Sequence, residues 1–191
     1  ARGGFVLLAA ITVPASIGLA LLAQPIATLM VGEALRAETA AALPWLALAG
    51  LMSGFSLYYW SEAFQLTRRT GQRALLMLVP GAVQLGLTAW LSATHGAVGA
   101  AIGAGAGASV GAMLLALAGR RLLALPLPGG ELARIGAATA IMAAAVIAFP
   151  GAHTTIGLFQ SAVLGTTVYA AAAIALNVMG ARACTLCRAH R

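Results

Sequence analysis

Three short patterns in this sequence carry residue types that perform chemistry in other proteins. Two of them overlap in the stretch 95–121, HGAVGAAIGAGAGASVGAMLLALAGRR. A Gly-x-Ser-x-Gly centred on Ser109 has the form of a serine-hydrolase nucleophile, and a degenerate Gly-x-Gly-x-x-Ala at 103–108 has the form of a nucleotide-binding loop. Both motifs act where a β-strand turns into a helix, so the element that carries them decides what they do.

The third pattern is the Cys-x-x-Cys-x-x-His formed by Cys184, Cys187 and His190. Three ligands without a fourth make a poor structural zinc site. Haem attachment requires a histidine directly after the second cysteine, where this sequence has Arg188. We therefore predict no metal site and no cofactor.

The composition predicts the elements that must position these residues. The 191 residues are 61% hydrophobic and 8% charged, and their mean hydropathy is +0.96. A soluble globular domain has about 25% charged residues, so the sequence predicts an integral membrane protein. We expect an all-α, polytopic membrane bundle of six transmembrane helices. Their apolar runs are 3–31, 43–67, 74–94, 97–119, 135–149 and 156–180.

The charged residues orient these expected spans. Ten of the eleven arginines fall on one side, in connections or at the termini, and the short fifth run must cross for charged and uncharged connections to alternate. By the positive-inside rule, this side and both termini are cytoplasmic. Trp45 and Trp90 fall near the outer ends of their spans, as in an aromatic belt. The net charge of +7 therefore reports topology, and we expect no nucleic-acid partner.

The membrane setting changes the meaning of the glycine-rich stretch. A membrane span has no strand before it, which argues against the nucleotide loop and the hydrolase elbow. Intramembrane serine proteases carry a Ser in a fourth helix and a His in a sixth, and their Ser stands in a Gly-x-Ser-Gly motif. Here the sequence around Ser109 is GASVG, and His153 falls in a loop. Glycines four apart instead form a flat ridge for helix packing, and here they are Gly99, Gly103, Gly107 and Gly111.

Three stretches occur in an order that is typical of a known family. An apolar helix breaks at Gly32 and re-enters through an alanine-rich segment, in LLAQPIATLMVGEALRAETAAALPWLALAG. The next helix ends in the basic turn EAFQLTRRTGQRALL, and the third runs into THGAVGAAIGA, with His95 where the family usually has an aromatic residue. Together they resemble the C-terminal part of the polysaccharide flippases of the multidrug/oligosaccharidyl-lipid/polysaccharide exporter superfamily. The resemblance covers about 5–121, and the last two spans match only as a generic hairpin.

The resemblance implies transport rather than catalysis. Such a flippase moves an undecaprenyl-linked saccharide precursor across the bacterial cytoplasmic membrane for polysaccharide biosynthesis, by alternating access between two helical lobes. It further implies that the six spans are part of the second lobe and act with a missing N-terminal lobe or a partner chain, since six helices of one lobe's size do not form two rocking halves. The expected partners are membrane lipids and the lipid-linked saccharide.

The domain boundaries follow from the linker LALPLPGGELA. We expect a four-helix unit at 1–121, a cytoplasmic linker at 122–134, a final transmembrane hairpin at 135–180 and a basic cytoplasmic tail at 181–191. An enzyme is not expected, because spacing brings no Ser, His and carboxylate together. An intramembrane serine protease-like enzyme and a small membrane scaffold or assembly subunit remain the alternatives.

Charge and polarity inside the spans indicate the candidate binding residues. A charge inside the bilayer costs about 2.5–3.5 kcal/mol, so Glu62 requires an explanation. It either forms a polar cavity with Tyr58, Tyr59 and Gln65, or extends to the cytoplasmic surface and pairs with an arginine. Gln84, near the middle of the third span, is either a cavity ligand or an interhelical hydrogen-bonding group.

The basic turn after the second span offers a second set of candidates. Guanidinium groups of Arg68, Arg69 and Arg73 suit the oxygens of a substrate pyrophosphate. The same arginines could instead serve topology and contact anionic lipids. The proline residues Pro14, Pro25 and Pro80 lie inside spans, where each favours a bend.

Overall fold

The computed structural model describes residues 2–60, 70–122, 129–148 and 155–178. Over these residues the fold is all-α and contains no strand, which confirms the predicted class. In chain order the elements are α1 (Arg2–Leu21), α2 (Ala23–Met30), the 3-10 turn η1 (Glu33–Leu35), α3 (Arg36–Phe55), the π-helical segment η2 (Ser56–Trp60), α5 (Thr70–Leu122), α6 (Gly129–Ala148) and α7 (Thr155–Ala175).

The helices have the length and composition of membrane spans. Among the described residues, five helical segments are long and apolar enough to cross a bilayer, and the longest of them is Gly71–Gly119. Large apolar side chains also cover the outside of the bundle: Leu85 is 73% exposed, Ile147 70% and Phe159 74%, each on a different helix. Soluble monomers rarely expose so much apolar surface, so these faces indicate a membrane protein.

The 53-residue helix α5 is folded back on itself. Gly96 has φ 57° and ψ −137°, a backbone conformation that only glycine adopts readily, and it divides α5 into limbs 70–95 and 97–122. The Glu38 carboxylate, from the first turn of α3, accepts a hydrogen bond from the backbone N–H of Ala97 at 2.8 Å. The second limb therefore begins with a cap supplied by another helix, because its first N–H groups have no partner within the helix.

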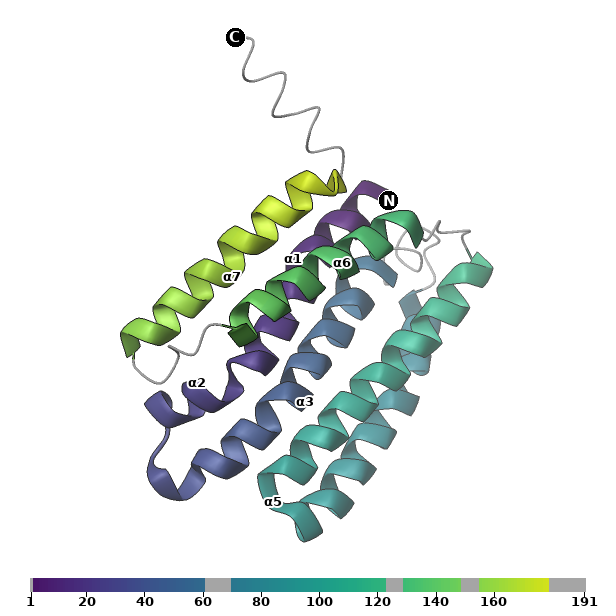
Figure 1. Ribbon diagram of the computed structural model, residues 1–191. Helices are drawn as coiled ribbons and strands as arrows, with labels where there is room; N and C mark the ends of the chain where they lie inside the picture. The colour runs from purple at the N-terminus through teal and green to yellow at the C-terminus, as the bar shows by residue number, and fades with distance from the viewer. Residues whose placement is uncertain (1, 61–69, 123–128, 149–154, 179–191) are drawn as a thin grey trace.

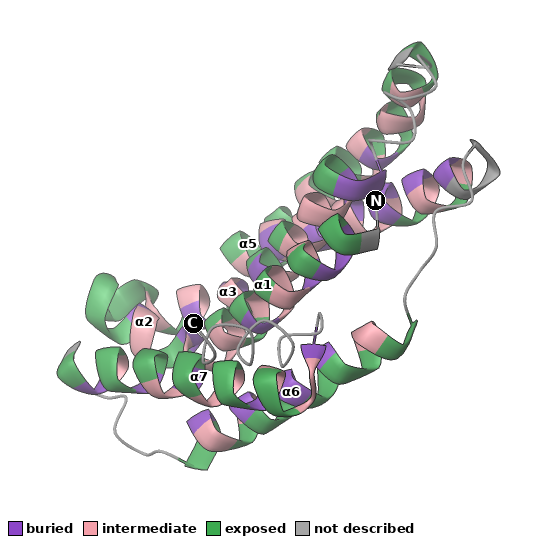
Figure 2. Cartoon of the chain, turned by 90° about the horizontal axis from the view of Figure 1, so that it is seen from above, coloured by how far each residue is buried: buried purple, intermediate pink, exposed green. Residues whose placement is uncertain are grey.

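The bundle has six long limbs: α1, α3, the two limbs of α5, α6 and α7. They form a curved row with α1 near its centre (Figures 1 and 2). The α5 hairpin packs on α3, α3 packs on α1, and the α6–α7 hairpin packs on the other side of α1. At one end of the bundle, α1 and α6 begin and α7 ends, and both limbs of α5 reach the same end. The opposite end holds the Gly96 turn and the α2–α3 connection. Successive limbs along the chain therefore run in opposite directions.

Several helix boundaries differ from the expected ones. The helix α3 begins at Arg36 instead of 43, and α6 begins at Gly129 instead of 135, within the expected linker. Each helix has an acidic residue in its first turn, which suits the positive end of the helix dipole, and hydropathy alone passes over such polar turns. The helix α7 ends at Ala175 instead of 180, because Asn177 adopts a left-handed conformation with φ 53°.

The prolines affect the helices in different ways. Pro25 has no N–H, and a proline ring conflicts with the carbonyl four residues earlier; the first span accordingly breaks at Leu22, between α1 and α2. Pro14 and Pro80 lie inside α1 and α5, and Pro44 lies inside α3. A proline inside a helix leaves one backbone carbonyl without its usual donor, which matters below at Pro14.

Candidate functional site

Half of the predicted polar site lies outside the described residues, namely Glu62, Gln65, Arg68 and Arg69. The tail residues Cys184, Cys187 and His190 and the loop residue His153 lie outside them as well. The structure therefore places four of the predicted binding residues: Tyr58, Tyr59, Arg73 and Gln84.

The two tyrosines lie in η2 and point to different surroundings. Tyr58 is 69% exposed, whereas Tyr59 is 2% exposed. The ring of Tyr59 lies 4.4 Å from that of Phe5 and 4.9 Å from that of Trp60, measured between centroids. The two neighbouring side chains therefore face different sides of the segment. The structure makes Tyr59 part of an aromatic cluster that joins α1 to η2.

Arg73 lies one helical turn before Leu76 and Met77, which pack against this aromatic cluster. Its Nε atom is buried and has no hydrogen-bond partner in the described structure. A buried guanidinium nitrogen without an acceptor is costly, so this position favours an anionic or carbonyl ligand. Of the predicted pyrophosphate ligands, Arg73 is the one whose surroundings the structure describes.

Gln84 lies on the first limb of α5, and its residue is exposed. Its Cβ and Cα face Gly107 on the second limb, so the stem of the side chain belongs to the packing between the limbs. Pairs of glycine and facing residue repeat along the hairpin: Gly99 with Leu91, Gly103 with Thr88, and Gly111 with Pro80. The four ridge glycines thus lie against the other limb of the same helix. Ser109, between them, donates to the carbonyl oxygen of Gly105 at 2.7 Å.

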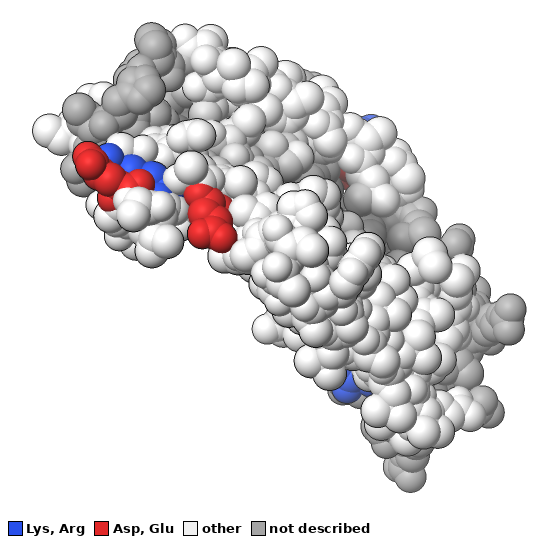
Figure 3. Space-filling view, turned by 90° about the horizontal axis from the view of Figure 1, so that it is seen from below, with Lys and Arg blue, Asp and Glu red and all other residues white. Residues whose placement is uncertain are grey.

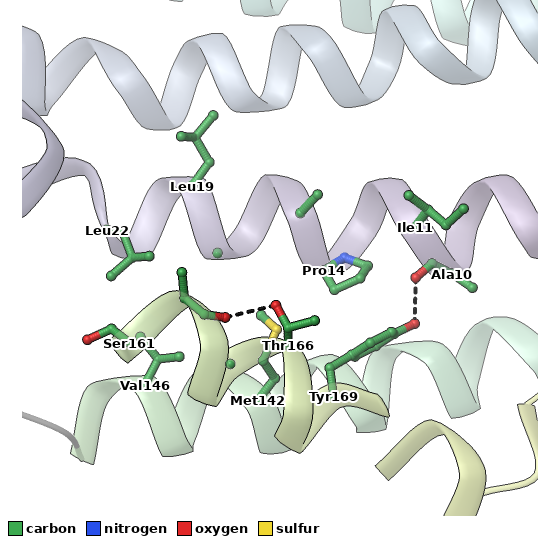
Figure 4. Close-up of a pocket in the computed structure, with 14 residues that line it drawn as sticks. Ala10, Ile11, Pro14, Leu19, Leu22, Met142, Val146, Ser161, Thr166 and Tyr169 are labelled. Atoms are coloured by element: carbon green, nitrogen blue, oxygen red, sulfur yellow. Dashed lines mark hydrogen bonds between the residues drawn. The ribbon is translucent and has the colours of Figure 1, made fainter. Parts of the chain in front are cut away.

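Figure 4 shows an apolar crevice, which sequence reasoning missed, between α1, α6 and α7. Its volume is about 420 Å³, within the range of about 300–1,000 Å³ that is typical of ligand-binding clefts. A local signal was present in α7, where the small residues Gly157, Ser161 and Gly165 recur every fourth position and are all buried. The lining residues are Ala10, Ile11, Pro14, Ala15, Gly18, Leu19, Leu22, Met142, Val146, Ser161, Ala162, Gly165, Thr166 and Tyr169.

The polar groups of the crevice are occupied by hydrogen bonds. Ser161 and Thr166 donate to backbone carbonyls one turn earlier on α7, at 2.9 and 2.8 Å. The phenol of Tyr169 donates to the carbonyl oxygen of Ala10 on α1 at 2.7 Å (Figure 4). With its hydroxyls satisfied by protein, the crevice offers an apolar surface and suits a hydrocarbon chain.

A second groove of about 410 Å³ lies where α5 and α6 separate, although they follow one another in the sequence. Phe5 and Trp60 of the aromatic cluster line it, together with Phe55 of α3, Ser109 of α5 and Leu132 of α6. It is apolar as well. The contacts between helices show that the four-helix unit and the final hairpin are joined mainly through α1.

The charged groups lie at the two ends of the bundle. One end carries Arg73 and Arg134. Arg134 pairs with Glu131 at 3.3 Å. It also donates to the carbonyl oxygen of Asn177, after the end of α7, at 3.3 Å. At the other end Arg36 pairs with Glu33 at 3.5 Å, and Glu38 caps Ala97. Figure 3 shows the bundle from below, with acidic and basic side chains side by side near one end and most of the surface uncharged. We call the first end the arginine end.

Comparison with known proteins adds no family to this description. No protein-family model matches the chain, and no curated protein is significantly similar to it.

Proposed function

We propose that this chain is part of a membrane transporter that moves a polyprenyl-linked saccharide precursor across the bacterial cytoplasmic membrane. In this proposal the arginine end faces the cytoplasm, and the six limbs work with a second helical lobe. The residues that resemble the polysaccharide flippases suggest the substrate class. The observation that supports it best is that one bundle holds both an apolar crevice and a buried arginine Nε with no hydrogen-bond partner among the described residues.

Such a substrate combines a long hydrocarbon chain with an anionic pyrophosphate, and the bundle has a surface for each. The crevice between α1, α6 and α7 is lined by apolar side chains and suits the hydrocarbon chain. The buried Nε of Arg73 has no acceptor in the part of the chain that the structure describes, and a guanidinium binds phosphate oxygens through directed hydrogen bonds. Arg68 and Arg69, close in sequence, would add to the same anion site.

The transport step requires parts that can move relative to one another. Few elements join the final hairpin to the four-helix unit, and α1 carries most of that contact. The break at Leu22 and the proline at position 14 also lie on α1, so this helix is the natural place for bending. Transporters of this general kind rock one bundle against another around a central site.

The test uses the protein in the full length that its gene encodes, with export of the saccharide measured per unit of protein in the membrane. Arg73→Ala should lower export, and Arg73→Lys should restore it only in part, because lysine lacks the planar fork of hydrogen-bond donors. Glu62→Gln should lower export while preserving the shape of the side chain.

The matched control is Arg36→Ala, which removes an arginine at the opposite end of the bundle, where the side chain pairs with Glu33. This variant should export normally. Equal export by Arg73→Ala and Arg36→Ala, at equal protein levels, would contradict the proposed anion site.

A further inference from the structure

One backbone carbonyl in α1 lacks its helical donor. In an α-helix the carbonyl of Ala10 accepts from the N–H of residue 14, but residue 14 is a proline. Pro14 is buried, and the segment belongs to an expected membrane span. No water is available there, so an unsatisfied carbonyl is costly.

Tyr169 of α7 supplies the missing donor. Its hydroxyl donates to the carbonyl oxygen of Ala10 at 2.7 Å, across 159 residues of sequence. The bond joins the final hairpin directly to α1, and its acceptor is the carbonyl that Pro14 leaves without a helical donor. A proline that leaves a carbonyl without its helical donor and a tyrosine that donates to that carbonyl therefore act together, although they are far apart in the sequence.

The position of this bond relates it to the crevice. Along α1 the crevice extends from Ala10 to Leu22, and along α7 it extends from Tyr169 back to Ser161. Figure 4 shows Tyr169 and Ala10 at one end of the crevice and Ser161 and Leu22 at the other. Because α1 begins at the arginine end, Tyr169 closes the crevice on the side of the arginines.

We propose that the hydrogen bond between Tyr169 and Ala10 is a latch that holds α7 against α1 and closes the crevice toward the arginine end. A lipid with its phosphate at the arginine end and its chain in the crevice would lie across this point. Opening separates Tyr169 from Ala10 and exposes the carbonyl that Pro14 left without a donor. This role for lipid entry rests on the proposed function, whereas the latch itself does not.

The latch is tested by measuring the distance between α1 and α7. Spin labels are attached at Leu7→Cys and Ala170→Cys, two exposed positions, in a protein whose native cysteines are replaced by serine. Distances are recorded by pulsed electron paramagnetic resonance in phospholipid vesicles. Tyr169→Phe keeps the ring and removes the hydroxyl, so the ratio of open to closed protein should rise about 2- to 13-fold, as expected for the loss of one hydrogen bond.

A second variant tests whether the proline is the cause. Pro14→Ala restores the N–H at position 14, which satisfies the Ala10 carbonyl within α1. In this background Tyr169→Phe should shift the distance distribution less, because the carbonyl then keeps a donor when Tyr169 loses its hydroxyl. Thr167→Val is the matched control on α7, because the Thr167 hydroxyl bonds only to carbonyls of its own helix. An unchanged distance in Tyr169→Phe, or equal effects with and without Pro14, would overturn the latch.

Lipid addition separates the latch from the proposed function. Undecaprenyl phosphate in the vesicles should shift the spin-labelled protein with Tyr169 and Pro14 intact toward the longer distance between labels. Phosphatidylglycerol at the same concentration should not. If Tyr169→Phe opens the protein but undecaprenyl phosphate does not, the latch stands and its proposed role in lipid entry is wrong.

Discussion

The close contact between the two limbs of α5 leads to a sharp prediction at Gly103. A Cβ added there would lie 2.6 Å from the backbone nitrogen of Thr88 and 2.8 Å from its Cα. Both atoms belong to the backbone of the facing limb, which cannot rotate away as a side chain can. Gly103→Ala should therefore push the two limbs apart.

The size of the effect can be estimated from these distances. Ordinary contact begins near 3.4 Å, so the backbones must separate by roughly 0.8 Å. Overpacking of this kind costs about 1–3 kcal/mol, and a backbone clash favours the upper end. The higher helix propensity of alanine relative to glycine offsets about 1 kcal/mol of this cost. We expect Gly103→Ala to lower the free energy of unfolding by about 2 kcal/mol.

Gly86→Ala on the facing limb is the matched control. A Cβ added at Gly86 has nothing within 4 Å, so only the propensity gain of about 1 kcal/mol remains. The assay is reversible unfolding in mixed micelles, with the folded fraction followed by circular dichroism and size-exclusion chromatography. If Gly103→Ala is as stable as Gly86→Ala, the reasoning about the packing of the glycine ridge is refuted.

Three further predictions concern other parts of the bundle. Glu38→Ala removes the cap on Ala97 and should lower the free energy of unfolding by about 1 kcal/mol in the same assay, whereas Glu33→Ala breaks only an exposed ion pair and should have little effect. Phe5→Ala removes the ring that contacts Tyr59 and Trp60. The free energy of unfolding should fall by less than the ~3–5 kcal/mol that is typical of a water-soluble core, because lipid tails solvate apolar groups too. An equal or larger fall would contradict this account. Reporter fusions after residues 73 and 121 should report the cytoplasm and a fusion at residue 155 the outside, and an outside report at 121 would contradict the orientation.

Local patterns in the sequence predicted the class of fold and part of its packing. Hydropathy predicted the helices, and the spacing of Gly99, Gly103, Gly107 and Gly111 predicted a packed face. That spacing did not identify the partner, which is the preceding limb of the same helix. Helix ends that carry charge, such as the start of α6 at Gly129, lie beyond the reach of hydropathy because their turns are polar.

Contacts between distant residues could not be predicted in this way. The cap of Ala97 by Glu38 spans 59 residues, and the bond from Tyr169 to Ala10 spans 159. In each case one residue creates an unsatisfied backbone group and another satisfies it, and neither has a local pattern that identifies its partner. The polar cavity expected from Tyr58, Tyr59, Glu62 and Gln65 stays a prediction, because the last two lie outside the described residues; of the two tyrosines, Tyr58 is exposed and Tyr59 is buried.

The most direct test of the proposed function is transfer of a lipid-linked saccharide between the leaflets of a vesicle. The full-length protein is reconstituted, and a fluorescent undecaprenyl-pyrophosphoryl saccharide is followed by quenching with membrane-impermeant dithionite. We expect protein-dependent transfer that Arg73→Ala slows and Arg36→Ala does not, and no transfer of phosphatidylglycerol carrying the same fluorophore. Equal transfer of the two lipids, or no protein-dependent transfer of the saccharide lipid, would contradict the proposal.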